Sequence, residues 1–246
     1  MKNLKGWNST TASIRKELKV PKNTTVLSIG DTHFPFTNHK QLNKIYSLVK
    51  EIKPNIVVQV GDIYDMHTFS RFARSVNFIT PQEELEQGRK MAGEMWTKIH
   101  KLVPKARLYQ LRGNHCCRIW KKIMAKLPEY ESIVGDTIEK LFKFSHVETM
   151  PTERSELVIN DIVYIHGWKV SIGAHVRWFS QSVVCGHSHK GGVYFQRMRN
   201  EPLFELNCGS IVNEDVAPLE YGETKTNSWI GGCGVIDQYG PRFISL

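Results

Sequence analysis

Three short apolar segments separated by helix-like stretches constrain the fold of this chain more than any other feature. Residues 25–29, 55–60 and 106–111 are apolar and rich in β-branched side chains, as buried strands are. Between the first two, apolar residues keep helical spacing up to Ile52, and Asn38 is expected to be the N-cap. This strand–helix–strand unit predicts parallel pairing and an α/β sheet covered by helices.

The second half of the chain has a different pattern, in which short β-like segments follow one another with turn signals between them. These segments are residues 157–159, 162–165, 182–185, 193–197, 203–206, 234–237 and 242–245. The two halves together predict two sheets packed face to face with helices outside.

Further helices are predicted for a long segment that starts at Pro81, for a basic segment that ends near Leu127, and for residues 137–142 and 174–179. At the start of the chain, residues 1–23 are interpreted as a polar lead-in with a short helix near residues 13–18. Residues 24–246 are expected to form a single domain, which suits a chain of 246 residues.

Potential metal ligands follow five of the predicted strands, and ligands of α/β sheets bind beyond the carboxyl ends of strands. The motifs are Asp31-Thr-His33, Gly61-Asp62-Ile-Tyr-Asp65, Gly113-Asn114-His115, His166-Gly167 and Gly186-His187-Ser-His189. Each motif alone is explained as well by a capping aspartate or a surface histidine. Their joint occurrence at five strand ends instead predicts a metal site with mixed nitrogen and oxygen ligands.

The residue types in these motifs suit a pair of metals. The two oxygens of Asp62 can each bind one cation, and Asn114 offers a neutral carbonyl oxygen. Asp65, one turn further on, is expected to orient a neighbouring group. His115 is expected to face the substrate and to protonate a leaving oxygen, so His115 and Asp65 are the catalytic candidates.

The order of these motifs resembles the calcineurin-like metallophosphoesterase superfamily, from Asp31 to His189. The resemblance implies a four-layer α/β/β/α sandwich that hydrolyses phosphate esters with two divalent metals. The mixed nitrogen and oxygen ligands favour manganese first, with iron, zinc, nickel or magnesium as alternatives. The resemblance also implies one metal held by Asp31, His33, Asp62 and His189, and a second held by Asp62, Asn114, His166 and His187. His115 is implied as the catalytic acid or the transition-state stabiliser.

Two positions depart from patterns within this superfamily. An acidic residue usually follows the Asn-His pair, but this chain has Cys116, and a thiol is a poor substitute for a carboxylate. Either another carboxylate, such as Asp65, reaches His115, or His115 works with less help. The protein Ser/Thr phosphatase branch carries Asp-Arg-Gly where this chain has Asp65-Met66-His67. Both differences favour a phosphodiesterase or nuclease.

Charge and aromatic residues bear on a nucleic-acid partner. The formal net charge is +9, which attracts polyanions but is also explained by solvated helix faces. The basic stretches 71–74 and 112–126 lie next to the metal motifs. Four aromatic residues lie near the motifs in the sequence: Tyr64, Phe69, Phe72 and Trp120. They would either stack on bases or belong to the core or its rim.

Composition predicts a cytoplasmic location. The five cysteines show no zinc-finger spacing and are interpreted as reduced thiols. There is no apolar run of the roughly 18 residues that a membrane span needs, so no membrane partner is expected. Two alternatives to a phosphodiesterase stay open: a phosphomonoesterase for a small molecule or a protein, and an inactive scaffold on the same fold.

Overall fold

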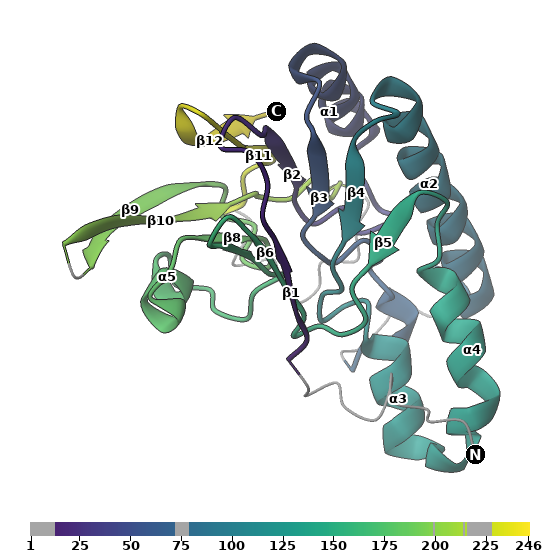
Figure 1. Cartoon of the computed structure of the whole chain (residues 1–246). Coiled ribbons are helices and arrows are strands. Elements are labelled where there is room, and N and C mark those ends of the chain that lie inside the picture. Colours follow the sequence, from purple (N-terminus) through teal and green to yellow (C-terminus); the bar gives the residue numbers. More distant parts are fainter. Residues whose placement is uncertain (1–12, 72–78, 199, 214, 216–227) are drawn as a thin grey trace.

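The computed structural model describes residues 13–71, 79–198, 200–213, 215 and 228–246 (Figure 1). One sheet contains β2 (Val26–Ile29), β3 (Ile56–Gln59), β4 (Arg107–Gln110), β5 (Val147–Thr149), β11 (Gly232–Asp237) and β12 (Gly240–Ser245). The other contains β1 (Arg15–Leu18), β6 (Glu156–Ile159), β7 (Ile162–Tyr164), β8 (Val183–Cys185), β9 (Gly192–Met198) and β10 (Glu201–Asn207). The helices are α1 (His39–Ile52), α2 (Pro81–Leu102), α3 (Arg118–Lys126), α4 (Glu131–Leu141) and α5 (Ala174–Phe179), with 3₁₀ turns η1 (His67–Phe69) and η2 (Pro128–Tyr130).

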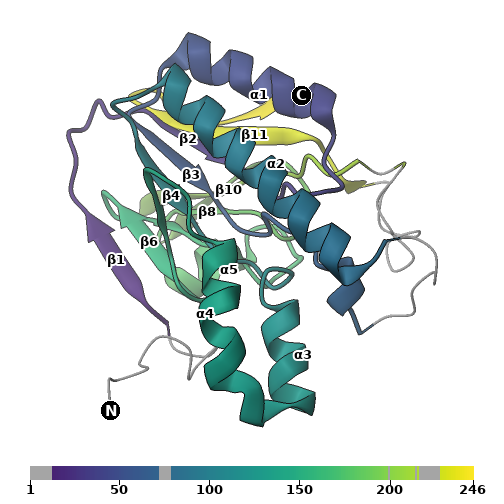
Figure 2. The ribbon, with the colours of Figure 1, turned by 90° about the vertical axis from the view of Figure 1, so that its right-hand side faces the viewer.

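The two six-stranded sheets are mixed and lie between two helical layers, as predicted. The strand orders are β12-β11-β2-β3-β4-β5 and β1-β6-β7-β8-β10-β9. Helices α1 and α2 lie across the outer face of the first sheet, and α5 lies beyond the second (Figures 1 and 2). Strands β2, β3, β4 and β5 pair in parallel, so the predicted βαβ arrangement is confirmed.

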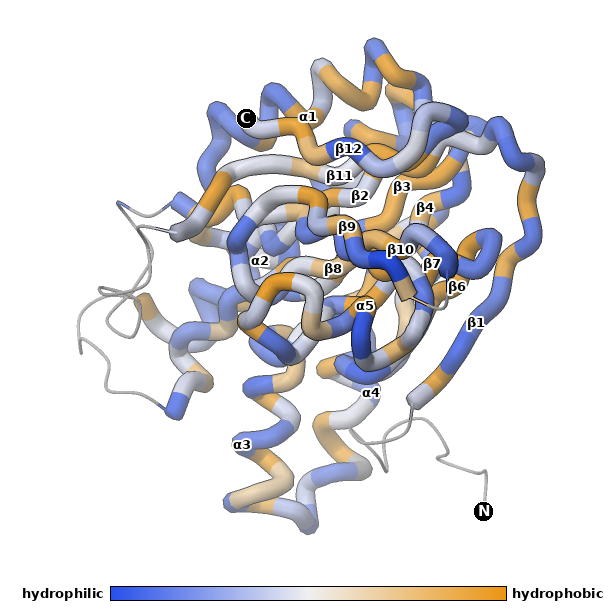
Figure 3. The backbone as a smooth tube through the Cα atoms, turned by 90° about the vertical axis from the view of Figure 1, so that its left-hand side faces the viewer, coloured by the Kyte–Doolittle hydropathy of each residue, from blue (hydrophilic) through white to orange (hydrophobic). Residues whose placement is uncertain are grey.

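Successive side chains of a strand point to opposite faces of the sheet, and this alternation builds the layers of the core. Leu27 and Val57 pack with the residues of α1 and α2, whereas Ile56 and Val58 point the other way and pack against the second sheet. Behind that sheet, Val163 packs near Phe179 of α5. Figure 3 shows hydrophobic colour along β3, which is buried on both faces, and alternating colour along α3, which is partly exposed.

Local sequence signals fix the starts of the two long helices. The side chain of Asn38 accepts hydrogen bonds from the backbone amides of Lys40 and Gln41, so the predicted N-cap is confirmed. Thr80 and Glu83 form a reciprocal capping box before α2, and Pro81 occupies its first turn.

The helix predicted near residues 13–18 is wrong, because residues 15–18 form strand β1. This strand pairs in parallel with β6 at the edge of the second sheet, so part of the predicted lead-in belongs to the sheet. Its charged residues suit an edge, where Arg15 pairs with Glu156 and Lys16 with Glu148. Strand β5, of three residues, was not predicted, and α4 extends further toward the N-terminus than the predicted helix at 137–142.

Two further observations concern the predicted environment of the chain. All five cysteines are buried and free of disulfides. In the part of the chain that the structure describes, no helix combines the length and the apolar character needed to cross a membrane.

Candidate metal centre

The seven residues predicted as metal ligands come together where strands of the two sheets end. They follow β2, β3 and β4 in the first sheet and β7 and β8 in the second. Asp31, His33, Asp62, His166 and His189 are buried, whereas Asn114 and His187 are partly exposed. The predicted ligands therefore line one site between the sheets, with its more open side at Asn114 and His187.

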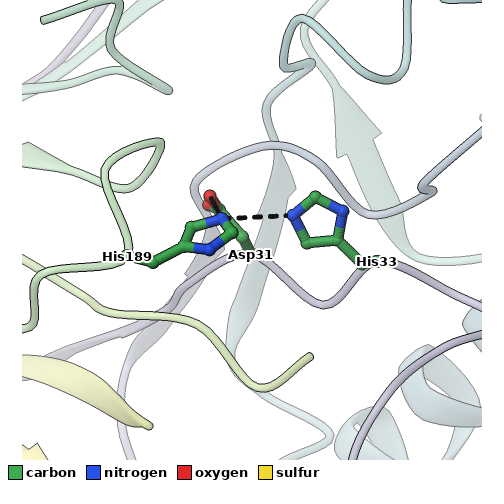
Figure 4. Close-up of side chains that lie close together, drawn as sticks. All are labelled: Asp31, His33 and His189. Atoms are coloured by element: carbon green, nitrogen blue, oxygen red, sulfur yellow. Dashed lines mark hydrogen bonds and ion pairs between the residues drawn. The ribbon is translucent and has the colours of Figure 1, made fainter. Parts of the chain in front are cut away.

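The first half of the site consists of Asp31, His33 and His189 (Figure 4). Nε2 of His189 lies 2.9 Å from Oδ2 of Asp31 and 3.2 Å from Nε2 of His33. The other carboxylate oxygen of Asp31, Oδ1, is buried and has no hydrogen-bond partner, although Nδ1 of His166 lies 3.7 Å from it. A buried carboxylate oxygen without a donor needs a compensating charge, so this half fits a cation.

The second half of the site surrounds Asp62 and Asn114. Nε2 of His166 lies 3.1 Å from Oδ2 of Asp62 and 3.0 Å from Oδ1 of Asn114. Nδ1 of His187 lies 2.9 Å from the same oxygen of Asn114. The halves adjoin, because ligand atoms of Asp31, Asp62 and His166 lie within 4.8 Å of one another.

The backbone is strained where it delivers these ligands. His33, Asp62, His187 and His189 have φ angles of 49°, 46°, 66° and 58°, in the left-handed region that side chains other than glycine seldom adopt. Such conformations persist only where the surrounding structure enforces them, and they cluster at functional sites.

Two motif glycines allow the carboxylates to approach neighbouring backbone. A Cβ on Gly113 would lie 2.1 Å from Oδ1 of Asp62, and one on Gly186 would lie 2.2 Å from Oδ1 of Asp31. Both glycines are required by this close packing, which explains why each precedes a predicted ligand.

The charge balance of the site keeps its carboxylates ionised. Burial alone would raise the pKa of Asp62, but the neighbouring imidazoles, His166 foremost, hold that pKa well below its usual range. The pKa of Asp31 is lowered in the same way, by His166 and His189 against the effect of burial. Burial lowers the pKa of His187 to about 4, so its imidazole is neutral at neutral pH.

The catalytic candidates His115 and Asp65 lie beside the first half of the site. The backbone amide of His115 donates to Oδ1 of Asp62 at 2.8 Å. Oδ2 of Asp65 lies 2.8 Å from Nδ1 of His33 and 3.6 Å from Nδ1 of His115, which also contacts the backbone oxygen of Asp65 at 3.1 Å. Asp65 therefore reaches both imidazoles. This is the first of the two possibilities that Cys116 left open, in which another carboxylate takes the place of the usual acidic residue.

Cys116 itself does not replace the acidic residue. Its side chain is buried, and burial raises the pKa of its thiol to about 12, so it stays neutral. Besides Asp65, His115 has a cationic neighbour, Arg118, whose Nη2 lies 3.0 Å from Nε2 of His115. The same guanidinium donates to the backbone oxygen of Asp65 at 3.0 Å and to its Oδ1 at 3.2 Å.

Sequence reasoning missed two residues that support the site. Arg118 lies three positions after His115, at the start of α3, where the two side chains can meet. Asn207, at the end of β10, donates to the backbone oxygen of Gly186 and to Oγ of Ser188, both at 2.9 Å. It thereby fixes the turn that carries His187 and His189, and its only sequence signal was its position at a strand end.

Several residues proposed for polyanion contact are not available for it. Tyr64 and Trp120 are buried, so of the two alternatives left open for them, base stacking or a place in the core, the core alternative holds. Arg112 is also buried; its Nη2 pairs with Oε2 of Glu139 at 2.9 Å, and its guanidinium lies over the ring of Phe142.

The other residues proposed for polyanion contact do not decide between contact and a place in the core. Phe69 packs partly buried against the core. Of the stretch 71–74, residues 72–74, and with them Phe72, lie outside the described residues.

An open cavity of about 520 Å³ adjoins the second half of the site. Three of the predicted metal ligands line this cavity: Asn114, His166 and His187. The other lining residues are Ser13, Glu153, Arg154, Glu156, Ile165, Gly167, Trp168, Trp178 and Phe179. A cavity of this size accommodates a small organic ligand.

Two facing sheets with clustered Asp, Asn and His side chains at their strand ends agree with a metal-dependent phosphoesterase. The family model described as calcineurin-like phosphoesterase matches residues 24–206. The chain therefore belongs to the calcineurin-like phosphoesterase family, and it is a metal-dependent phosphoester hydrolase.

Curated relatives come from bacteriophages. The chain is 24% identical over 233 residues to the Gene 54 protein of Mycobacterium phage D29, covering 86% of this chain and 88% of the relative. It is 23% identical over 232 residues to the Gene 54 protein of Mycobacterium phage L5, with the same coverage.

Similar solved structures include YfcE, a phosphoesterase from E. coli, with a TM-score of 0.42, 13% identity and coverage of 87% of this chain and 88% of that one. A dimetal phosphatase from Danio rerio gives a TM-score of 0.43 and 10% identity, covering 92% of this chain and 99% of that one.

Proposed function

We propose that the protein is a phosphodiesterase that acts on nucleic acid or on a nucleotide. The observation that carries this proposal is the open cavity beside Asn114, His166 and His187. A phosphodiester carries an organic group on each side of phosphorus, so its enzyme needs space on both sides of the reacting phosphate. The cavity supplies space for the second group.

The donor set supports two divalent metals. Asp31, His33, Asp62 and His189 would hold one, and Asp62, Asn114, His166 and His187 the other, with Asp62 as the bridge. Mixed imidazole, carboxylate and amide donors suit manganese, iron, zinc or nickel more than magnesium alone, and manganese is our first choice. Bound metals would lower the pKa of water and compensate charge on the phosphoryl oxygens.

The residues of the chain itself would act on the leaving group. We infer that His115 stabilises or protonates the departing oxygen, since its Nε2 lies 4.0 Å from Oδ2 of Asp62. In this structure Nε2 accepts from Nη2 of Arg118, because a guanidinium only donates, so His115 can give a proton from this nitrogen only after that contact opens. Arg118 itself adds a permanent positive charge there. Asp65 would orient both His33 and His115 through its contacts with their Nδ1 atoms.

Hydrolysis of two chromogenic esters tests the proposal. With Mn²⁺, we expect a higher kcat/KM for bis-p-nitrophenyl phosphate, a diester, than for p-nitrophenyl phosphate, a monoester. A strong preference for the monoester would contradict the proposal and indicate a phosphomonoesterase. The cytoplasmic location stays a prediction, to be tested by cell fractionation.

A further inference from the structure

We propose that the cavity beside the metal centre is a nucleobase subsite in which Trp178 and Trp168 stack on the base of a nucleotide ester. The inference rests on the proposed function and names the group that fills the cavity. Trp168 follows His166 by two residues, and Trp178 lies on α5. Both line the same cavity as Asn114, His166 and His187.

The two tryptophans are exposed although they are large and apolar. Trp168 is 44% exposed and Trp178 is 66% exposed. Their ring centroids lie 5.9 Å apart at an interplanar angle of 88°, so the rings form a right-angled corner. A planar base can stack on one ring and meet the other edge-on, and this stacking does not depend on which base is present.

The charges around the cavity favour an anionic ligand. Within the described residues, Arg154 forms no ion pair, and its side chain is exposed at the cavity. The two carboxylates of the wall are already compensated, since Glu153 pairs with Lys121 and Glu156 with Arg15. Arg154 is thus positioned for a phosphate of a bound nucleotide or of the next nucleotide in a strand.

Hydrogen bonds, some of them buried, hold this corner in place before a ligand binds. Nε2 of His175 accepts from the backbone amides of Trp168 at 3.1 Å and Lys169 at 3.2 Å. Glu205 accepts from the amides of Gly173 at 2.9 Å and His175 at 2.8 Å. These contacts tie the segment after His166 and the start of α5 to strand β10, so the subsite is preorganised.

The test compares two diesters that share the p-nitrophenolate leaving group. One is the p-nitrophenyl ester of thymidine 5′-monophosphate, and the other is methyl p-nitrophenyl phosphate, which has no base. We expect the wild-type protein with Mn²⁺ to prefer the nucleotide ester. Trp178→Ala should lower the ratio of the two kcat/KM values about tenfold, because the base loses a stacking partner. Trp178→Phe should restore part of it.

Tyr239→Ala is the matched control, because Tyr239 is an exposed aromatic residue in the β11–β12 turn, outside the cavity lining. It should leave the ratio unchanged. Equal kcat/KM values of the wild type for both diesters, or an equal loss on both in Trp178→Ala, would overturn the subsite while leaving the phosphodiesterase function intact.

A binding measurement separates the subsite from the function. Calorimetric titration with thymidine 5′-monophosphate in the presence of Mn²⁺ should show Kd rising about tenfold in Trp178→Ala. This result without any diester hydrolysis would overturn the proposed function and support the subsite. An unchanged Kd would overturn the subsite and leave the exposed tryptophans to a protein partner.

Discussion

His115 is the residue whose role depends most on its surroundings. It follows Asn114 directly, and its Nδ1 faces Asp65 while its Nε2 faces Arg118. Its backbone amide, rather than its ring, makes the short contact with Asp62. Removal of the ring therefore leaves the seven predicted metal ligands in place while taking away the group expected to act on the leaving oxygen.

His115→Ala should retain bound metal and lose most turnover, with kcat falling roughly 10²- to 10⁴-fold, the range typical of a general acid. Metal content by elemental analysis and kcat for bis-p-nitrophenyl phosphate are the measurements. His39→Ala is the control, since His39 is exposed at the start of α1. Unchanged turnover in His115→Ala would remove His115 from the mechanism.

The ligand residues could be read from the sequence because each directly follows a strand, and strand ends of parallel sheets share an edge. Arg118 and Trp178 could not, because their positions depend on the direction in which α3 and α5 leave the site. The aromatic residues selected by their closeness to the motifs, Tyr64 and Trp120, are in the core. Of the two tryptophans that line the cavity, Trp168 lies two residues after His166, whereas Trp178 has no motif beside it in the sequence.

At the scale of elements, helix α2 supports the metal centre through Glu84. This buried carboxylate accepts from the backbone amides of His67 and Thr68 and from the hydroxyl of Thr68, all in η1. The turn η1 begins two residues after Asp65. Glu84 therefore links the long helix to the segment that carries an orienting carboxylate.

Glu84→Ala should lower the free energy of unfolding by about 2 kcal/mol, because it removes the acceptor of buried donors. Urea unfolding measures this change. The variant should also weaken Mn²⁺ binding, since Asp65 loses part of its support. Thr80→Ala, which removes the cap of the same helix at a cost of about 1 kcal/mol, should leave Mn²⁺ binding unchanged. Equal Mn²⁺ affinity in both variants would contradict the link.

The elements that sequence patterns predicted are those with their own local or periodic signals. The buried strands β2, β3 and β4, and the helices α1 and α2 with their caps, are examples. Strands β1 and β5 have three or four residues and lie at sheet edges, so their β-structure depends on pairing with distant segments. A charged segment such as β1 fits a helix or an edge strand equally well until its partner is known.

At the scale of the whole molecule, the metal centre joins the two sheets through buried charges. His166, from the second sheet, contacts Asp62 of the first at 3.1 Å. Burial opposes the charged form of His166, but Asp62 and Asp31 outweigh this effect and raise its pKa to about 9. An exposed histidine has a pKa of about 6.5. In the metal-free protein, the difference between the pKa of folded His166 and that of an exposed histidine makes the packing of the two sheets depend on pH.

Because the folded state binds this proton more tightly than the unfolded state, the stabilisation is complete below about pH 6.5 and is lost as pH rises through about 9. We therefore expect the free energy of unfolding of chelator-treated protein to fall between pH 6.5 and 8. Burial also raises the pKa of the thiols of Cys116 and Cys233 to about 12. Because cysteines of the unfolded chain ionise near pH 8.5, these thiols lower the free energy of unfolding too, but only from about pH 8.5 upward. His166→Asn should flatten the slope in the lower window, measured by urea unfolding. An identical slope in this variant would assign the pH dependence to other groups.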